Sequence, residues 1–474
     1  MARQKRNTVL VSTFVVIISS LLVLSCNPTR KREKPNILLI IADDLGWGDV
    51  GYHNSDVKTP NLDRLASEGL ELDRFYVTPI CSPTRAGLLT GRYPDRFGLR
   101  NNVVRPWLDF GLDTTEVTLP ELLADVGYNN RALVGKWHLG HFRKAYHPLS
   151  RGYNYFYGHL NGAIDYFGLK RDGEKDWHEN FLPSDDVGYA TNLIGKKALQ
   201  LIRSYSKQDN PFFIQVAFNA PHSPLQATRK YLDQYGFDPQ KPTFIKGRGR
   251  GNSKRQTYSA MVTHMDDEIG KMLNLMDSLG ITENTIVLFM SDNGAELSKG
   301  GSNGNLRGAK LTEWEGGVRV PALIKWPGKI NEGSTTEQVI GYVDIVPTLL
   351  GLMGESIPKS ANIDGLDMSD CILGNKSIQR TLYLGNGALI NQQYKLIEGG
   401  DKIGLTRMKI AEDHFFDVST DQNEKDNLAP GMLDPYLKMK QEVKAFNEIK
   451  PSVPRPKDIK PENFKAPEKW KPVE

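Results

Sequence analysis

The sequence predicts an α/β fold: a large, mostly parallel β-sheet sandwiched by helices, with a smaller α+β domain after it. Continuous apolar runs occur within residues 35–44, 211–218 and 284–294, and each has the length of a strand buried on both faces. Helical patterns separate these runs, and strands that alternate with helices are typical of parallel sheets. The chain has 474 residues, enough for one large domain and a smaller one.

Three segments carry the helical patterns. Residues 59–69 combine a capping threonine, an amphipathic stretch and a terminal glycine, which are the start and stop signals of a helix. Residues 119–127 and 257–279 are predicted helices as well. These helices would cover the faces of the sheet.

A change in composition separates a C-terminal region from the large domain. Residues 350–378 are rich in Gly, Ser, Asp and Asn, and two strand-like runs (380–384 and 393–397) and a helix at about 434–448 follow them. Pro and Lys are dense from Pro451 onward, so this tail should be extended or loosely docked. The predicted parts are a large domain at 35–355, a small α+β domain at 356–450 and a tail at 451–474.

The N-terminus has the pattern of a targeting segment. A basic start and a mostly apolar stretch, Val9–Leu24, predict a signal peptide at 1–26 and a tether at 27–34. The run Val23-Leu24-Ser25-Cys26 resembles a bacterial lipobox, which would place a lipid anchor on Cys26. The protein would then be exported, to the periplasm or as an outer-membrane lipoprotein. An ordinary signal peptide or an uncleaved anchor is the alternative.

Overall composition excludes some classes of protein. The hydrophobic content of 39% and charged content of 24% are those of a globular protein. A formal net charge of +4 gives no reason to expect nucleic acid as a partner. Three cysteines cannot form a disulfide framework.

Oxygen-bearing side chains follow two of the predicted strands. Asp43 and Asp44 end the first apolar run, and Asp292 and Asn293 end the last. In parallel sheets, ligands bind beyond the carboxyl ends of the strands. Oxygen ligands suit a hard cation, so we expect Ca²⁺, with Mg²⁺ as the alternative. Taken alone, Asp292-Asn293-Gly294 would be an ordinary turn.

Cys81 begins the run Cys81-Ser82-Pro83-Thr84-Arg85, which continues to Thr90-Gly91. A lone cysteine is most often a small buried side chain. A C-x₅-R phosphatase loop would need arginine at position 87, which is glycine, and no local signature of a cysteine protease is present. The run resembles the sulfatase signature C-x-P-x-R-x-x-x-x-T-G.

Three more segments resemble motifs of the same family. Residues 127–140 are similar to G-Y-x-T-x-x-x-G-K-W-H-L-G, with Asn130 in place of threonine, and supply Lys136 and His138. On an extended segment, residues two apart point the same way, so this pair could face one site. Residues 220–224 supply His222, and residues 307–321 supply Lys310.

With the Asp43-Asp44 segment, the resemblance covers residues 35–350. The chain thus looks like a formylglycine-dependent type I sulfatase of the alkaline phosphatase superfamily, near arylsulfatase B (N-acetylgalactosamine-4-sulfatase).

The resemblance implies an alkaline-phosphatase-like fold and a hydrolase mechanism. A maturation enzyme would convert Cys81 to formylglycine, whose hydrate attacks sulfur and also contacts the cation. His222 would protonate the leaving oxygen, and His138 would take a proton from the modified residue. Lys136, Lys310 and Arg85 would hold the modified residue and the sulfate oxygens. A phosphatase or phosphodiesterase of the superfamily and an inactive glycan-binding protein are the alternatives.

The expected substrate is a sulfated polysaccharide or its oligosaccharides: ulvan, a carrageenan-like galactan or a glycosaminoglycan. Position near the motifs makes five residues candidate sugar contacts, although each could be structural: His141, Asn161, Asp165, Tyr166 and Asn303. A basic stretch at 246–255 could attract polyanions, but a solvated loop is the favoured interpretation.

Overall fold

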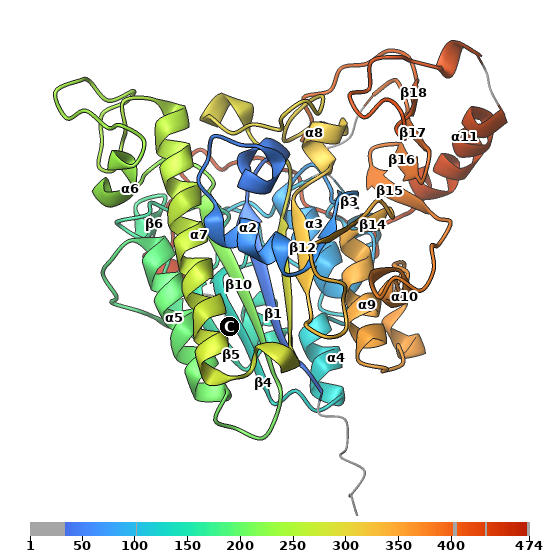
Figure 1. Ribbon diagram of the computed structural model, residues 1–474. Helices are drawn as coiled ribbons and strands as arrows, with labels where there is room; N and C mark the ends of the chain where they lie inside the picture. Colours follow the sequence, from blue (N-terminus) through green and yellow to red (C-terminus); the bar gives the residue numbers. More distant parts are fainter. Residues whose placement is uncertain (1–33, 101, 402–404, 432–433, 472–474) are drawn as a thin grey trace, which may run out of the picture. The chain divides into compact units, whose positions relative to one another are not determined.

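The structure is a computed structural model that describes residues 34–100, 102–401, 405–431 and 434–471 (Figure 1). The predicted signal peptide and the proposed lipid site at Cys26 lie outside the described residues. Pro35–Glu474 forms one compact unit. In the described part of the chain, no helix has the length and apolar character needed to cross a membrane.

A ten-stranded mixed sheet forms the centre of this unit, in the order β13-β2-β12-β11-β1-β10-β4-β5-β8-β9. The five strands from β11 to β5 are parallel to one another, which confirms the predicted parallel sheet at its centre. Towards the edges, β12 is antiparallel to β11 and β2, and β8 is antiparallel to β5 and β9. The strands are β1 (Asn36–Asp43), β2 (Leu70–Leu72), β4 (Asn130–Lys136), β5 (Tyr155–His159), β8 (His178–Glu179), β9 (Leu182–Pro183), β10 (Phe212–Pro221), β11 (Thr285–Ser291), β12 (Ala322–Lys325) and β13 (Ser334–Thr336).

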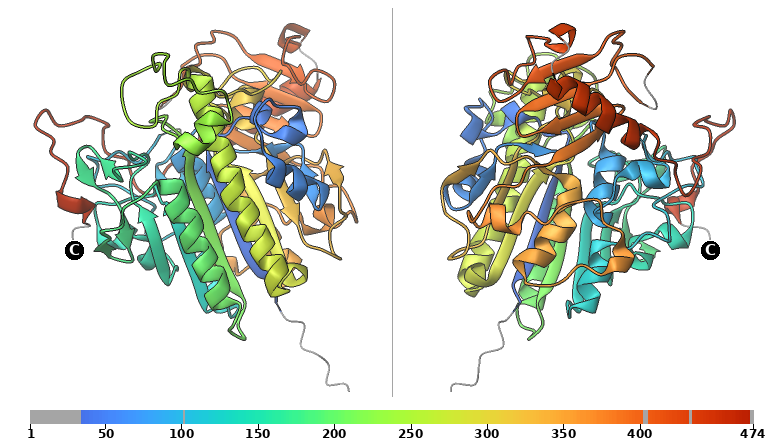
Figure 2. Two further views of the ribbon diagram at one scale, coloured as in Figure 1. Left: turned by 60° about the vertical axis from the view of Figure 1, so that its left-hand side comes forward. Right: turned by 90° about the vertical axis from the view of Figure 1, so that its right-hand side faces the viewer.

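Helices cover both faces of the sheet (Figures 1 and 2). Alternate residues of β1 point to opposite faces. Ile37, Leu39 and Ile41 join the core under α3 (Cys81–Thr90), α4 (Leu119–Asp125) and α9 (Ile345–Leu352). Leu38, Ile40 and Ala42 join the core under α2 (Pro60–Ser67), α5 (Ala190–Tyr205) and α7 (Lys254–Leu279). The helices predicted at 59–69, 119–127 and 257–279 are thus present as α2, α4 and α7.

A small antiparallel sheet, β15-β16-β17-β18, lies in the C-terminal region beside α11 (Figure 1). Its residues belong to the same hydrophobic cluster as α3, α4 and α9, so the two sheets share a continuous core. The bounds are β15 (Thr381–Gly385), β16 (Ala388–Asn391), β17 (Tyr394–Ile397), β18 (His414–Asp417) and α11 (Asp434–Asn447). Shorter elements are β3 (Phe75–Tyr76), β6 (Lys170–Arg171), β7 (Glu174–Lys175), α6 (Arg229–Asp233), α8 (Glu315–Val318), β14 (Ile340–Gly341) and α10 (Ser369–Ile372).

The tail after residue 450 has little regular structure, but it is packed against the rest of the unit. The Ser452 hydroxyl donates to Asp113 Oδ2 at 2.7 Å. The Phe464 ring meets Trp107 edge-on, and the Trp470 side chain is 1% exposed. Tail residues therefore reach the loop around residue 107.

Candidate active site

Cys81 is the first residue of α3 and is 2% exposed. Its Sγ lies 3.3 Å from His138 Nδ1, and His138 Nε2 lies 3.2 Å from the Val104 carbonyl oxygen. A carbonyl can only accept, so Nε2 carries the proton and Nδ1 presents a lone pair to Cys81. Burial raises the pKa of the Cys81 thiol. His138 therefore places a proton acceptor beside Cys81, and the raised pKa of Cys81 disfavours its thiolate form.

The residues of the cysteine run have separate structural tasks. Pro83 lies in the first turn of α3, where a missing N–H costs nothing. Arg85 donates through Nε to Asp292 Oδ2 at 2.9 Å, and its Nη2 lies 2.7 Å from the same oxygen in an ion pair. Gly91 ends the helix with φ of 66°, a conformation that favours glycine. The helix thereby directs its N-terminus, with its partial positive charge, at position 81.

Three buried ion pairs bring the predicted charged residues together. Lys136 Nζ is 2.6 Å from Asp43 Oδ2, and Lys310 Nζ is 2.5 Å from Asp44 Oδ1. The Arg85–Asp292 pair is the third. Burial tends to raise the pKa of Asp44, but the positive charge of Lys310, joined at low pH by that of protonated His222, outweighs it and holds that pKa below its usual range. All these charges lie at the carboxyl edge of the parallel strands.

The oxygen cluster fits a divalent cation. Donor atoms of Asp43, Cys81 and Asp292 lie within 4.8 Å of one another. Asp43 Oδ1 and Asn293 Oδ1 are buried without a hydrogen-bond partner among the described residues, as expected of oxygens that coordinate an ion. Burial raises the pKa of Asp43 to about 8 despite Lys136, and a bound cation would oppose that shift. Together with Asp44, the predicted ligands converge on one site.

His222 follows β10 and faces Asp44. Its Nε2 lies 3.7 Å from Asp44 Oδ2, and its Nδ1 lies 2.6 Å from the Ser223 carbonyl oxygen. Burial lowers the pKa of His222 to about 3, even though Asp44 opposes the shift. The imidazole is therefore neutral near pH 7, with its proton on Nδ1 and a bare Nε2.

Lys136 and His138 both reach the site, but the prediction that they do so from one face of an extended segment is wrong. β4 ends at Lys136, and His138 has φ of 62°, in the left-handed region. This turn directs the imidazole to Cys81 while Lys136 contacts Asp43. Asp44 and Leu311, which also belong to the site, have positive φ as well. A Cβ at Gly162 would lie 2.3 Å from His138 Nε2, so only glycine fits there.

The site opens into a cavity of about 260 Å³. Cys81, His138, His222 and Lys310 line it, as the motifs predict. Sequence reasoning did not predict the other ten residues of the wall, and of these only Leu311 lies within one of the motif segments described above: Ile80, Val103, Val104, Arg105, Pro106, Gly162, Ala163, Arg171, Leu311 and Leu405.

The five candidate sugar contacts do not line this cavity. Asn161 donates to Asp176, and Tyr166 donates through its hydroxyl to the carbonyls of Asn219 and His222. His141 pairs with the Pro106 carbonyl, Asp165 accepts from Phe167, and Asn303 accepts from Ala295. Their side chains stabilise the loops around the site.

Part of the basic stretch at 246–255 is also held in place. Arg248 stacks on Phe167 at 4.1 Å, and Arg250 donates to the Leu225 carbonyl. Arg255 lies in α7 and pairs with Asp49 and Asp56. These three cations are therefore engaged with the protein itself.

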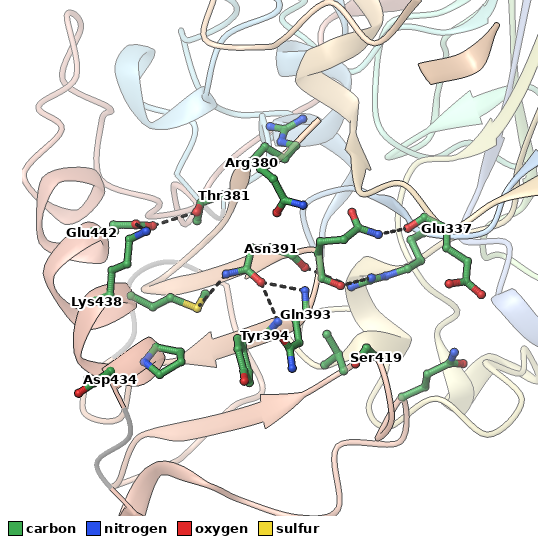
Figure 3. A pocket seen from close by; sticks show the side chains of 17 residues that line it. Glu337, Arg380, Thr381, Asn391, Gln393, Tyr394, Ser419, Asp434, Lys438 and Glu442 are labelled. Carbon is green, nitrogen blue, oxygen red and sulfur yellow. Dashed lines mark hydrogen bonds and ion pairs between the residues drawn. The ribbon is translucent and has the colours of Figure 1, made fainter. Parts of the chain in front are cut away.

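A larger cavity, of about 1070 Å³, lies between the small sheet and α11 (Figure 3). Its side chains bond to one another: Thr381 donates to Glu442 at 2.9 Å, and Asn391 contacts Met439 Sδ at 3.6 Å. Its lining residues, all of them described, include no histidine or cysteine. We therefore assign the chemistry to the smaller cavity.

A family model described as Sulfatase matches residues 35–355. Rat N-acetylgalactosamine-6-sulfatase is 38% identical over 392 residues, which are 77% of this chain and 71% of that protein. Mouse arylsulfatase J is 36% identical over 352 residues, 73% of this chain; the aligned part is 56% of that relative's length.

Two solved structures are similar to this chain in fold. Ps i-CgsB in complex with k-i-k-neocarrahexaose has a TM-score of 0.76 at 30% identity, and the match covers 88% of this chain and 93% of that one. The PsFucS1 sulfatase from Pseudoalteromonas sp. has a TM-score of 0.71 at 25% identity, covering 92% and 94%.

Proposed function

The chain belongs to the sulfatase family, and we propose that it hydrolyses sulfate esters of a sulfated polysaccharide or its oligosaccharides. Relatives named for an N-acetylgalactosamine sulfate and a neighbour that holds a neocarrahexaose support this substrate class. Ulvan, carrageenan-like galactans and glycosaminoglycans are the candidates. The observation that carries the proposal is the position of His138 Nδ1, 3.3 Å from Cys81 Sγ at the N-terminus of a buried helix.

Two groups would complete this site. Oxidation of Cys81 by a maturation enzyme would yield formylglycine. An oxygen of its hydrate would stand where Sγ stands now and would be the nucleophile that attacks the sulfur of the sulfate ester. Asp43, Asp44, Asp292 and Asn293 would hold a divalent cation, Ca²⁺ or Mg²⁺, which polarises a sulfate oxygen when bound.

The remaining residues bind the anion and move protons. Lys310 lines the cavity, and with Lys136 and the N-terminus of α3 it favours the developing negative charge. His138 Nδ1 is placed to take a proton from the group at position 81. His222 Nε2 is the donor for the leaving sugar oxygen, once a bound sulfate favours its protonated form.

Replacement of Cys81 tests the proposal. We expect wild-type protein, produced with an aerobic maturation enzyme, to release sulfate from 4-nitrophenyl sulfate and to lose about 18 Da at the peptide containing Cys81. Cys81→Ala should fold and show no turnover. Near-wild-type turnover by Cys81→Ala, or faster hydrolysis of 4-nitrophenyl phosphate than of the sulfate by the wild type, would contradict the proposed function.

We also propose that the protein is exported and anchored through lipid on Cys26, on the basis of its N-terminal sequence. Labelling with a radioactive fatty acid in a bacterial host should mark the wild type and not Cys26→Ala. Equal labelling of both proteins would argue against the anchor.

A further inference from the structure

Two arginines lie on the cavity wall outside the catalytic ion pairs. Arg105 and Arg171 line the same cavity as Cys81 and His222, but they come from separate segments. Arg105 lies in the loop before Trp107, and Arg171 is the last residue of β6. Neither belongs to a sequence motif. Lys136, Lys310 and Arg85 are held in buried ion pairs, whereas Arg105 and Arg171 are partly exposed and each pairs with an aspartate, Asp458 and Asp172.

Both guanidinium groups have hydrogen-bonding capacity to spare. Arg105 donates one bond, from Nε to Asp458 Oδ2 at 3.0 Å, and its two terminal nitrogens donate to no described residue. Arg171 donates to Asp172 Oδ2 at 3.1 Å and to the Ala163 carbonyl at 3.4 Å, and its Nη2 donates to no described residue. Their side chains are 30% and 28% exposed. A guanidinium carries five N–H donors, so both residues of the wall keep unused donors in addition to their ion pairs.

The tail holds both arginines in place. Asp458 pairs with Arg105, and the Trp470 indole donates to the Arg171 carbonyl at 2.9 Å. Figure 2 shows the tail, in red, running back to the turquoise region that contains β6 and β7. The tail thus restrains the Arg105 side chain and the Arg171 backbone before a ligand arrives, which reduces the conformational entropy lost on binding.

We propose that Arg105 and Arg171 form a second anion-binding subsite. It would bind a carboxylate or a second sulfate, on the sugar that carries the scissile sulfate or on the adjoining sugar. This inference rests on the proposed function. A cavity of about 260 Å³ is small for a ligand site, so it would seat about one sugar ring, and the second anion must be close to the first. The planar fork of arginine matches both oxyanions.

Binding to the Cys81→Ala protein tests the subsite without turnover. Three disaccharides that share one sulfated ring are compared by calorimetry: one with no other charge, one with a second sulfate and one with a uronate carboxylate. We expect at least one dianionic ligand to bind about 10-fold more tightly than the monoanionic one. The ligand that binds more tightly shows whether the subsite prefers a sulfate or a carboxylate. Adding Arg105→Ala or Arg171→Ala should reduce the affinity for that ligand by about 10- to 100-fold, as expected for lost charge-assisted hydrogen bonds. The affinity for the monoanionic ligand should fall less.

Arg229→Ala is the matched control, since Arg229 is 57% exposed on α6 and does not line the cavity. Equal affinity for all three disaccharides would overturn the subsite, and so would losses that are the same for monoanionic and dianionic ligands. Failure of the wild type to release sulfate from 4-nitrophenyl sulfate and from every disaccharide would instead contradict the proposed function. The binding comparison decides the subsite in either case.

Discussion

At the scale of single residues, the two histidines of the site differ in which nitrogen carries the proton. The Val104 carbonyl fixes the proton of His138 on Nε2, and the Ser223 carbonyl fixes that of His222 on Nδ1. His138 therefore offers a lone pair to position 81, while His222 needs a second proton before it can act as an acid. The negative charge of a bound substrate would favour this second proton, because a nearby anion raises the pKa of an imidazole.

His222→Gln should affect substrates according to their leaving groups. A sugar alkoxide needs a proton as it leaves, whereas 4-nitrophenolate does not. We expect kcat to fall by about 100-fold or more for a sulfated sugar and far less for 4-nitrophenyl sulfate. Steady-state kinetics on both substrates would check this, with the Tm of the variant as the control for folding. Equal falls in kcat on both substrates would show that His222 is not the general acid.

The unpartnered oxygens of Asp43 and Asn293 lead to a prediction about metal ions. Ca²⁺ added to chelator-treated protein should raise the Tm, because a ligand at a hundred times its Kd stabilises the folded state by about 2.7 kcal/mol. The shift should be largely lost in Asp43→Asn and retained in Asp233→Asn, whose carboxylate is exposed on α6. Differential scanning calorimetry would measure it. Equal shifts in both variants would place the ion elsewhere.

At the scale of elements, the predictable part of the site is the part set by local sequence. Buried runs fixed β1, β10 and β11, and their ends brought Asp43, His222 and Asp292 to one edge. The left-handed turn at His138 was not predictable, since a non-glycine residue takes this conformation only under tertiary constraint. Arg105 and Arg171 were missed for a related reason: the long-range contacts with Asp458 and Trp470 that hold them leave no local pattern.

The tail is the element whose docking is easiest to test. Trp470 is buried against His141 and Arg171, so Trp470→Ala should release the tail while the sheet stays folded. Trypsin should then cut after Lys457 or Lys465 about 10-fold faster than in the wild type, as expected for a local opening favoured by about 1.4 kcal/mol. Mass spectrometry of the early fragments would locate the cuts. Unchanged cleavage would mean that the other tail contacts are sufficient.

At the scale of the whole molecule, buried histidines make stability depend on pH. Burial lowers the pKa of His147, His159 and His264 to about 3, from 6.5 in an unfolded chain. Between these values the unfolded state binds more protons, so stability falls as pH drops through this window. We expect each histidine to cost about 1 kcal/mol at pH 5.5 relative to pH 7.5.

Urea unfolding at the two pH values would measure this loss. In His264→Gln the dependence on pH should be shallower than in the wild type, even though the variant loses ring stacking with Tyr189 and Tyr231. A pH slope that is unchanged in the variant would mean that other groups control it.

The burial of α3 also bears on when Cys81 could be oxidised relative to folding. Every residue from Cys81 to Thr90 is buried, and helices and loops surround them. A maturation enzyme acting on Cys81 would have to reach a residue that is 2% exposed and begins a fully buried helix. If Cys81 is oxidised as proposed, the modification would therefore have to come before folding is complete, and a chain that folded first would keep its thiol.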